Sequence, residues 1–368
     1  MKFILISPKN RTTYNFRGDL LKEIISKGYE VIVTGPNEEC IDKIKELGVR
    51  FVRIPLNKNG LSAIADIKYM LALRTLLKEE KPDITLGYTI KPVIYGAIAA
   101  KLAGVKNINS MVTGVGYAFT AKTKKAKIIR TIASVLYIIA FKCANTIIFQ
   151  NQDDLTEFVE RKLIKREKCK LVNGSGVNMQ KFKPVPLPER LTFFMLSRVM
   201  HSKGIREYLE AAKEVKGKYP EVRFMLLGAV ENIQDSLRME DLRPYIDNGI
   251  IDYYGETDDV ASYYRQCSVY VLPSYREGTP RTVLEAMAMA RPIITTDAPG
   301  CRETVVDRVT GFLVPVQDTE ILVEKMEWFI KNQDEIMKMG QASYQLCRDK
   351  FDVQKVNADM LEYMNITP

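Results

Sequence analysis

Two apolar runs flank a helix-length segment in SVYVLPSYREGTPRTVLEAMAMARPIITTD, residues 268–297. The runs SVYVLPS (268–274) and RPIITTD (291–297) are rich in β-branched residues, which favours strands. PRTVLEAMA, which follows a Gly-Thr turn, predicts a helix between them because proline is favoured at helix starts. A strand, a helix and a strand in this order predict two parallel strands joined by a crossover.

The same alternation continues in both directions along the chain. In the second half, further strands are expected at residues 191–197, 222–228, 250–255 and 311–315. In the first half, strands are expected at residues 3–7, 29–35, 49–54, 83–88, 107–112 and 145–150, with helices at 19–27, 64–80, 93–103 and 124–143. This pattern predicts the α/β class, with two Rossmann-like, doubly wound domains that face a central cleft. Ligands of such sheets bind outside the carboxyl ends of the strands.

A proline-rich segment, KPVPLP (183–188), marks the expected link between the two domains. We therefore expect a first domain at residues 1–182 and a second domain at residues 189–349. The tail has a helical pattern, and its last helix, at about residues 350–368, is expected to pack back on the first domain.

The composition is that of a folded globular protein, with 46% hydrophobic and 27% charged residues in 368. Six cysteines are scattered without a CxxC pair, which favours reduced thiols and a cytoplasmic setting over a disulfide framework or a zinc cluster. The single histidine, His201, excludes a metal site built from several histidines. The N-terminal apolar run breaks at Ser7 and Pro8, too early for an export signal, and no run is long enough to predict a membrane span.

The charge is distributed unevenly between the two halves. Residues 1–180 contain 30 Lys and Arg against 16 Asp and Glu, a balance of +14, whereas the remaining residues contain 24 against 29, a balance of −5. The basic half is suited to an anionic partner, either nucleic acid or an anionic membrane surface. The sequence contains no helix-turn-helix, zinc-finger or aromatic RNA-binding signature, so we expect no nucleic acid and favour the membrane surface.

Several features of the second half are suited to a nucleotide diphosphate. Arg198 and Lys203 in SRVMHSKG (197–204) follow the end of a strand, where two cations can stabilise a diphosphate leaving group. Gly278 lets the backbone approach a ligand closely. The helix that starts after Pro280 offers its first amides to phosphate, those of Arg281, Thr282 and Val283.

Two glutamates belong to the same stretch. Glu285, one turn into the helix, can reach the vicinal hydroxyls of a ribose, and Glu277 lies in the loop before the helix. The simpler alternative is that Glu277 is a surface turn residue and Glu285 a solvated helix residue.

These motifs resemble those of the retaining glycosyltransferases of family 4, which have the GT-B fold. The two glutamates form E-x7-E within residues 276–305, SRVMHSKG is similar to the family's phosphate motif, and VNGSGVNMQKF (172–182) resembles the segment that closes its first domain. The resemblance implies that Glu285 holds the donor ribose, that Arg198 and Lys203 hold the diphosphate, and that Glu277 lies beside the donor sugar. It further places Thr279 in the donor loop and the base near Tyr254. No DxD motif occurs, so we expect neither a metal nor another cofactor.

The first half resembles one subgroup, which extends sugars on polyprenyl diphosphates. TGVG (113–116), NFRG (15–18) and YTIKP (88–92) carry this resemblance. It implies four acceptor-binding residues, which are Arg17, Lys91, Thr113 and Gly114. Many members carry a histidine near this TGVG, and this chain has none there. His201 does not replace it, because it lies between Arg198 and Lys203 in the other half.

The resemblance therefore implies a transferase that moves a hexose or N-acetylhexosamine from a UDP-sugar to an undecaprenyl diphosphate-linked saccharide. Such an enzyme is expected to be peripheral on the inner face of the cell membrane. Lys122, Lys124, Lys125 and Lys127 precede an apolar helix and are expected to bind the anionic surface. Most apolar residues of Ile128–Phe141 are expected to be core.

Two other classes of function remain open from the sequence. A UDP-sugar epimerase has the same two-domain architecture, but it needs acid and base groups that a chain with one histidine supplies poorly. A catalytically idle binding subunit is disfavoured because Arg198, Lys203, Glu277 and Glu285 are all present. The sequence leaves the sugar, the linkage and the acceptor saccharide undetermined.

Overall fold

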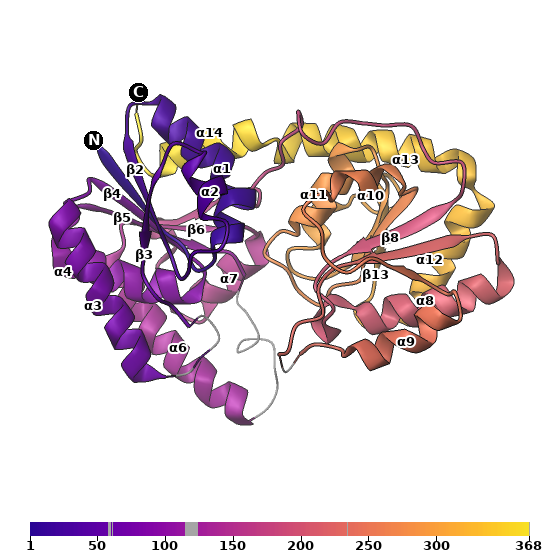
Figure 1. Cartoon of the computed structure of the whole chain (residues 1–368), viewed down its shortest axis with the longest axis horizontal. Helices are drawn as coiled ribbons and strands as arrows, with labels where there is room; N and C mark the ends of the chain where they lie inside the picture. The colour runs from indigo at the N-terminus through magenta and orange to yellow at the C-terminus, as the bar shows by residue number, and fades with distance from the viewer. Residues whose placement is uncertain (58–59, 61, 115–123, 234, 368) are drawn as a thin grey trace. The chain divides into compact units, whose positions relative to one another are not determined.

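The structure is a computed structural model that describes residues 1–57, 60, 62–114, 124–233 and 235–367. The chain forms two compact units, each with its own sheet (Figure 1). The first unit comprises Met1–Gly176 and Val353–Pro368, and the second comprises Val177–Asp352.

The first unit contains a parallel sheet of seven strands in the order β3-β2-β1-β4-β5-β6-β7. Its strands are β1 (Lys2–Ile6), β2 (Glu30–Gly35), β3 (Arg50–Arg53), β4 (Ile84–Tyr88), β5 (Asn107–Val112), β6 (Thr146–Phe149) and β7 (Cys169–Leu171). All the strands pair in parallel, for example with Ile4 beside Ile32 on one side and Thr85 on the other. The strand order reverses between β1 and β4, which is the topological switch point of this sheet.

Two layers of helices cover this sheet. One layer contains α3 (Ala63–Glu80), a π-helical turn (Pro92–Gly96), α4 (Ala97–Ala103), α6 (Lys124–Cys143) and α7 (Gln152–Glu160), and the other contains α1 (Asn10–Ser26), α2 (Ile41–Lys45) and α14 (Val353–Tyr363). The C-terminal α14 contacts α1, and both lie on the same side of the sheet in Figure 1. The last helix of the chain thus completes the core of the first unit.

The second unit contains six parallel strands in the order β10-β9-β8-β11-β12-β13. Its strands are β8 (Thr192–Leu196), β9 (Arg223–Leu227), β10 (Asp252–Tyr253), β11 (Val269–Leu272), β12 (Ile293–Thr296) and β13 (Gly311–Val314). Its α-helices are α8 (Ile205–Lys218), α9 (Met239–Asp247), α10 (Ala261–Arg265), α11 (Arg281–Ala288), α12 (Thr319–Lys331) and α13 (Gln333–Leu346). The switch point of this sheet lies between β8 and β11.

The fold class predicted from the alternation of strands and helices is confirmed. All twelve expected strands are present, and the structure adds β7, whose three residues are too few for a sequence pattern. The expected helix at 19–27 is wrong in its start, because α1 begins at Asn10 and includes the whole polar segment before Asp19. Within the described ranges, no helix is both long enough and apolar enough to cross a membrane.

The proline-rich segment at 183–188 does not link the two units. Arg291, a buried residue, donates hydrogen bonds to the carbonyls of Val185 (3.1 Å) and Pro186 (3.0 Å), so this segment is fixed to the second unit. Phe182 also belongs to the core of that unit. The first compact unit ends at Gly176, where we expected a boundary after residue 182.

Candidate active site

The candidate site lies at the carboxyl ends of β8 and β11, which are adjacent strands in the second sheet. The chain leaves β8 for α8 and β9 on one side, and leaves β11 for α11 and β12 on the other side. The two loops that follow these strands, residues 197–204 and 273–280, therefore meet at the switch point. Parallel α/β sheets bind their ligands in this position.

Lys203 is held by a short 3₁₀ turn, His201–Lys203, that ends at Gly204. Gly204 has a φ of +73°, and a Cβ atom there would lie 2.1 Å from the carbonyl oxygen of Pro273. Glycine is therefore required for two reasons, namely its left-handed backbone and the close approach of the β11 loop. This approach brings Lys203 to the loop that carries Glu277.

Replacement of Gly204 with alanine should destabilise the second unit and displace Lys203. Gly28 provides a matched control, since its φ is +81° but a Cβ there would meet nothing within 4 Å. We expect Gly28→Ala to cost about 1–2 kcal/mol from the backbone alone, and Gly204→Ala about 2–4 kcal/mol because a steric clash is added. Chemical denaturation measures both losses, and equal losses would show that the contact with Pro273 does not constrain this turn.

The Lys203 ammonium and the Glu277 carboxylate form an ion pair, with 2.5 Å between Nζ and Oε1. Both side chains are largely buried, with 18% and 15% of their surfaces exposed. An ammonium has three donors, and Glu277 is the one hydrogen-bond partner of the Lys203 ammonium within the described part of the chain, so two N–H groups can bind other oxygens. The structure thus brings together two of the residues predicted from the sequence, one from each loop.

The backbone of the Glu277 loop is supported by the loop that follows β12. The amide of Glu277 donates to the carbonyl of Pro299 (2.9 Å). A Cβ atom on Gly300, whose φ is +79°, would lie 2.2 Å from the carbonyl oxygen of Glu277 and 2.6 Å from that of Gly278. The backbone of Glu277 and Gly278 is therefore packed closely against Gly300.

Tyr275 provides a second support for the same loop. Its hydroxyl donates to the buried carboxylate of Glu207 on α8 (2.6 Å), and its amide donates to the carbonyl of Ser202 (2.9 Å). Burial raises the pKa of Tyr275 to about 12, so it remains a hydrogen-bond donor at neutral pH. These contacts fix the position of the loop after β11 relative to the loop after β8.

Arg198 and His201 have other contacts. The guanidinium of Arg198, about half exposed, pairs with Glu231 (Nη1 to Oε2, 3.2 Å), which follows β9. The backbone amide of His201 donates to the carbonyl of Asp235. Arg198 thus lies at the carboxyl edge, as predicted, but it meets a different carboxylate from Lys203.

The start of α11 differs in part from the prediction. The amide of Val283 donates to the carbonyl of Pro280 (3.0 Å), so it is already engaged within the first turn, and its contact with phosphate stays a prediction. Thr282 and Thr279 are both partly exposed, and the hydroxyl of Thr279 donates to the carbonyl of Gly278 (2.9 Å). The first turn of the helix is therefore already tightened by a local hydrogen bond.

Glu285 lies inside the unit, with 11% of its side chain exposed. Its Oε1 is 3.3 Å from Nε of Arg281, and its Oε2 accepts a hydrogen bond from the hydroxyl of Tyr264 (3.2 Å). Burial raises the pKa of Glu285, although Arg281 and Tyr264 oppose this shift. The alternative in which Glu285 is a solvated helix residue is therefore wrong.

Tyr254 does not direct its hydroxyl toward these residues. The hydroxyl lies 2.5 Å from Nη2 of Arg223, and Arg223 is the first residue of β9. The side chain thus extends toward the amino end of β9, away from the carboxyl edge. The predicted contact of this side chain with the base is not supported by this geometry.

In the first unit, Arg17 lies on α1 and is 4% exposed. Its guanidinium lies 5.3 Å from the centre of the Tyr88 ring, and Tyr88 ends β4 at the switch point of the first sheet. The Tyr88 hydroxyl forms hydrogen bonds with Ser7 (2.7 Å) and Thr13 (3.2 Å). Arg17 is thus near the carboxyl edge, as predicted, but it is buried against the Tyr88 ring.

Lys91 is used differently from the prediction. Its ammonium pairs with Asp66 (2.5 Å) and donates to the carbonyls of Asn57 and Gly60, both at 2.8 Å. All three donors are occupied, so Lys91 fixes the loop before α3 and is not available to an acceptor diphosphate.

Thr113 and Gly114 follow β5 and are partly exposed. The rest of their motif lies in residues 115–123, outside the described residues. Lys122 also falls there, and the structure describes the backbone but not the side chains of Lys124 and Lys125.

Three site residues could not be selected from the sequence. Tyr264, Tyr275 and Glu207 support Glu285 and the Glu277 loop through tertiary contacts between distant segments. The sequence contains a local signal only for Gly300, since Pro-Gly after a strand predicts a turn. Among the described residues, no group of three or more His, Cys, Asp or Glu side chains is placed to hold a metal ion.

Two family models match this chain. The model described as "Glycosyl transferases group 1" matches residues 178–346, and the one described as "Glycosyl transferase 4-like" matches residues 4–151. The first match covers the second structural unit, and the second covers most of the first.

The chain is also similar to curated proteins along most of its length. It is 26% identical over 356 residues to a Campylobacter jejuni N,N'-diacetylbacillosaminyl-diphospho-undecaprenol alpha-1,3-N-acetylgalactosaminyltransferase, covering 93% of this chain and 92% of the relative. It is 27% identical to an Escherichia coli UDP-Gal:alpha-D-GlcNAc-diphosphoundecaprenol alpha-1,3-galactosyltransferase, covering 80% and 77%. It is 26% identical to the Staphylococcus aureus capsular polysaccharide biosynthesis glycosyltransferase CapM, covering 82% and 81%.

Solved structures share the fold. Anabaena HepE in complex with UDP-glucose superposes with a TM-score of 0.80 at 17% identity, covering all of both chains. Sucrose-phosphate synthase from Thermosynechococcus elongatus superposes with a TM-score of 0.83 at 17% identity, covering 99% of this chain and 98% of that one.

The two doubly wound units have the GT-B fold, and the family models and the curated relatives identify the chain as a glycosyltransferase. The two model matches and the curated relatives are consistent with family 4 of the glycosyltransferases, the family that its motifs resemble. The three curated relatives are transferases, and the epimerase alternative has no support among them.

Proposed function

We propose that this protein transfers a hexose or N-acetylhexosamine from a UDP-sugar to a saccharide carried on a polyprenyl diphosphate, with retention at the anomeric carbon. The Lys203–Glu277 pair at the carboxyl ends of β8 and β11 carries the proposal, because it supplies a cation for a leaving diphosphate beside a carboxylate. Support for the substrates comes from the Campylobacter and E. coli relatives, whose names specify diphosphoundecaprenol-linked acceptors.

The donor would be held mainly by the second unit. The two remaining N–H groups of Lys203 bind diphosphate oxygens, together with Arg198 and the start of α11. Glu285 accepts hydrogen bonds from the ribose hydroxyls, and its side chain is kept in place by Arg281 and Tyr264. Glu277 lies beside the sugar ring, where positive charge develops as the bond to the leaving group breaks.

In the proposed reaction, the acceptor hydroxyl attacks the anomeric carbon from the face that the diphosphate leaves. The anomeric C–O bond to the diphosphate breaks as the bond to the acceptor oxygen forms, and a diphosphate oxygen takes the acceptor's proton. Lys203 stabilises the charge on the leaving UDP. A covalent sugar trapped on Glu277 would contradict this mechanism and indicate a double displacement.

The acceptor would be held by the first unit, near Arg17, Thr113 and Gly114, at an anionic membrane surface on the inner side of the cell. The strongly basic balance of residues 1–180 supports an anionic partner for this unit.

A donor screen tests the proposed function. The protein is incubated with UDP-hexoses and UDP-N-acetylhexosamines and a short-chain polyprenyl diphosphate-linked monosaccharide, and products are identified by mass and anomeric configuration. We expect one donor to give a disaccharide with the donor's own anomeric configuration. An inverted product would contradict retention, and conversion of a UDP-sugar without acceptor would support an epimerase.

A further inference from the structure

Exposed apolar side chains are concentrated on one layer of helices. Among the described residues, fourteen large apolar side chains are exposed, and eight of them lie on α3, α4 and α6. These eight residues are Ile64, Ile67 and Leu71 on α3, Leu102 on α4, and Ile128, Ile132, Val135 and Ile139 on α6. The three helices cover the same face of the first sheet, and α4 contacts both of the others (Figure 1). We call this surface the α3–α4–α6 face.

Helix α6 is apolar on two opposite sides. Its inner side packs in the core through Tyr137, Ala140 and Phe141. Its outer side carries four large apolar residues at spacings of three and four, with exposed fractions of 63%, 57%, 53% and 44% from Ile128 to Ile139. These four residues are exceptions to the expectation that most apolar residues of Ile128–Phe141 are core. At 3.6 residues per turn they form one stripe on the side opposite Tyr137.

The charge of α6 is entirely basic. The helix contains Lys124, Lys125, Lys127, Arg130 and Lys142 and no Asp or Glu. The exposed Lys142 lies three residues beyond Ile139, and it therefore continues the same stripe at its C-terminal end. The basic residues are thus concentrated toward the two ends of the helix, and the apolar stripe lies between them.

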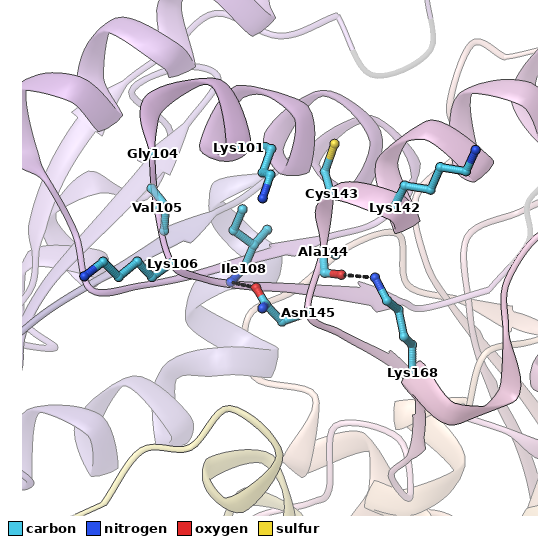
Figure 2. Close-up of a pocket in the computed structure, with 10 residues that line it drawn as sticks. All are labelled: Lys101, Gly104, Val105, Lys106, Ile108, Lys142, Cys143, Ala144, Asn145 and Lys168. Atoms are coloured by element: carbon cyan, nitrogen blue, oxygen red, sulfur yellow. Dashed lines mark hydrogen bonds between the residues drawn. The ribbon is translucent and has the colours of Figure 1, made fainter.

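More lysines lie where α4 and α6 end. An open pocket of about 530 Å³ is lined there by ten residues, among them Lys101, Lys106, Lys142 and Lys168. Lys168 donates to the carbonyls of Phe141 (3.1 Å) and Ala144 (2.7 Å) and so caps α6. In Figure 2 the side chains of Lys106 and Lys142 extend away from the pocket on either side. The pocket therefore forms a cationic border of the α3–α4–α6 face.

This pocket lies at the opposite edge of the sheet from the acceptor residues. Its residues Lys106 and Asn145 precede the first residues of β5 and β6, whereas Thr113 follows the end of β5. A ligand of this pocket would therefore not occupy the position proposed for the acceptor sugar.

We propose that the α3–α4–α6 face docks on a membrane that contains anionic lipid, with α6 lying in the plane of the interface. The apolar stripe would enter the boundary between headgroups and acyl chains, and the lysines at its ends would bind anionic headgroups. A second copy of the chain fits poorly, because two α6 helices face to face would oppose like charges. The proposal names the partner surface of the first unit, and it rests on the proposed function only for the acceptor being lipid-linked.

The test uses flotation of the full chain with phosphatidylcholine vesicles that contain phosphatidylglycerol. A variant with Ile128, Ile132, Val135 and Ile139 replaced by glutamine keeps the charge and the helix propensity. Its partition constant should fall at least a hundredfold, since each apolar side chain that enters the interface changes it by about tenfold. Met337→Gln is the matched control, because Met337 is an exposed apolar residue on α13 of the other unit and should have no effect.

A second variant separates the two contributions. Replacement of Lys127 and Lys142 with glutamine should weaken binding at low salt and have little effect at high salt, because screening removes the charge contribution. The glutamine variant of the apolar stripe should be weaker at both salt concentrations. If that variant does not fold, the pairs Ile128→Gln with Ile132→Gln and Val135→Gln with Ile139→Gln should each lower binding by about tenfold or more.

The proposal is overturned if the stripe variant binds vesicles as well as Met337→Gln, or if the wild-type chain does not bind anionic vesicles. It is also overturned if the wild-type chain is a dimer in sedimentation and the stripe variant is a monomer, since the face would then bind a second copy. Turnover of a short-chain, water-soluble acceptor should be the same in all variants. Absence of that turnover in the wild-type protein would contradict the proposed function and leave the vesicle result to decide the docking face.

Discussion

Replacement of Lys203 with methionine is expected to lower turnover at least a hundredfold. A cation that stabilises the diphosphate in the transition state by roughly 3 kcal/mol corresponds to such a loss. Steady-state kinetics with the donor found in the screen measures it. Lys338→Met is the matched control, because Lys338 is an exposed lysine on α13 of the same unit and should leave turnover unchanged.

Loss of Lys203 also removes the ion pair that it forms with the largely buried Glu277. This change should destabilise the protein by up to about 3 kcal/mol. The double variant Lys203→Met with Glu277→Gln removes both charges, so it should recover most of the stability and none of the turnover. Near-normal turnover of either variant would show that the diphosphate is not bound by Lys203.

The second prediction is that the two glutamates act in different ways. Glu285→Gln should weaken UDP binding at least tenfold, because a carboxylate that accepts two ribose hydroxyls contributes roughly 1.5–3 kcal/mol for each hydrogen bond. Glu277→Gln should lower kcat and change UDP affinity by no more than a few fold, because Glu277 acts at the transition state. Calorimetric titration of UDP into both variants separates these roles.

A modified ligand tests the proposed contact between Glu285 and the ribose directly. The wild-type protein should bind UDP more tightly than 2'-deoxy-UDP, and Glu285→Gln should bind the two with similar affinity. As the pH is lowered, UDP binding should begin to weaken at a higher pH than it would if the carboxylate were that of an exposed glutamate. Burial raises the pKa of Glu285, and a protonated carboxyl accepts fewer hydrogen bonds. If Glu277→Gln loses UDP binding and Glu285→Gln keeps it, the two roles are reversed.

The sequence predicts the fold well because strands of a buried parallel sheet are continuous apolar runs. Ile4, Leu86 and Ile294 lie in such runs, and each is fully buried in its sheet. The short β7 is missed because three residues carry no periodicity. The proline-rich segment at 183–188 resembles a linker in composition, but Arg291, which is distant in sequence, fixes it to the second unit.

The candidate site is predicted less completely, because tertiary partners decide which polar groups remain available. Lys203 and Glu277 are site candidates because they follow strands, and the structure adds an ion pair between them that the sequence did not predict. Lys91 has an equivalent position after β4, but its ammonium already binds the carboxylate of Asp66 and two backbone carbonyls. Tyr254 is correctly placed in the chain after β10, but its hydroxyl is bound by Arg223. No local sequence pattern distinguishes these outcomes.

The most direct test of the central claim is a crystal structure of the protein with UDP bound. The account predicts that the diphosphate lies at the carboxyl ends of β8 and β11, within hydrogen-bond distance of Nζ of Lys203, with the ribose hydroxyls on the carboxylate of Glu285. UDP bound at another place, with the Lys203–Glu277 pair unchanged and the ribose away from Glu285, would contradict the account.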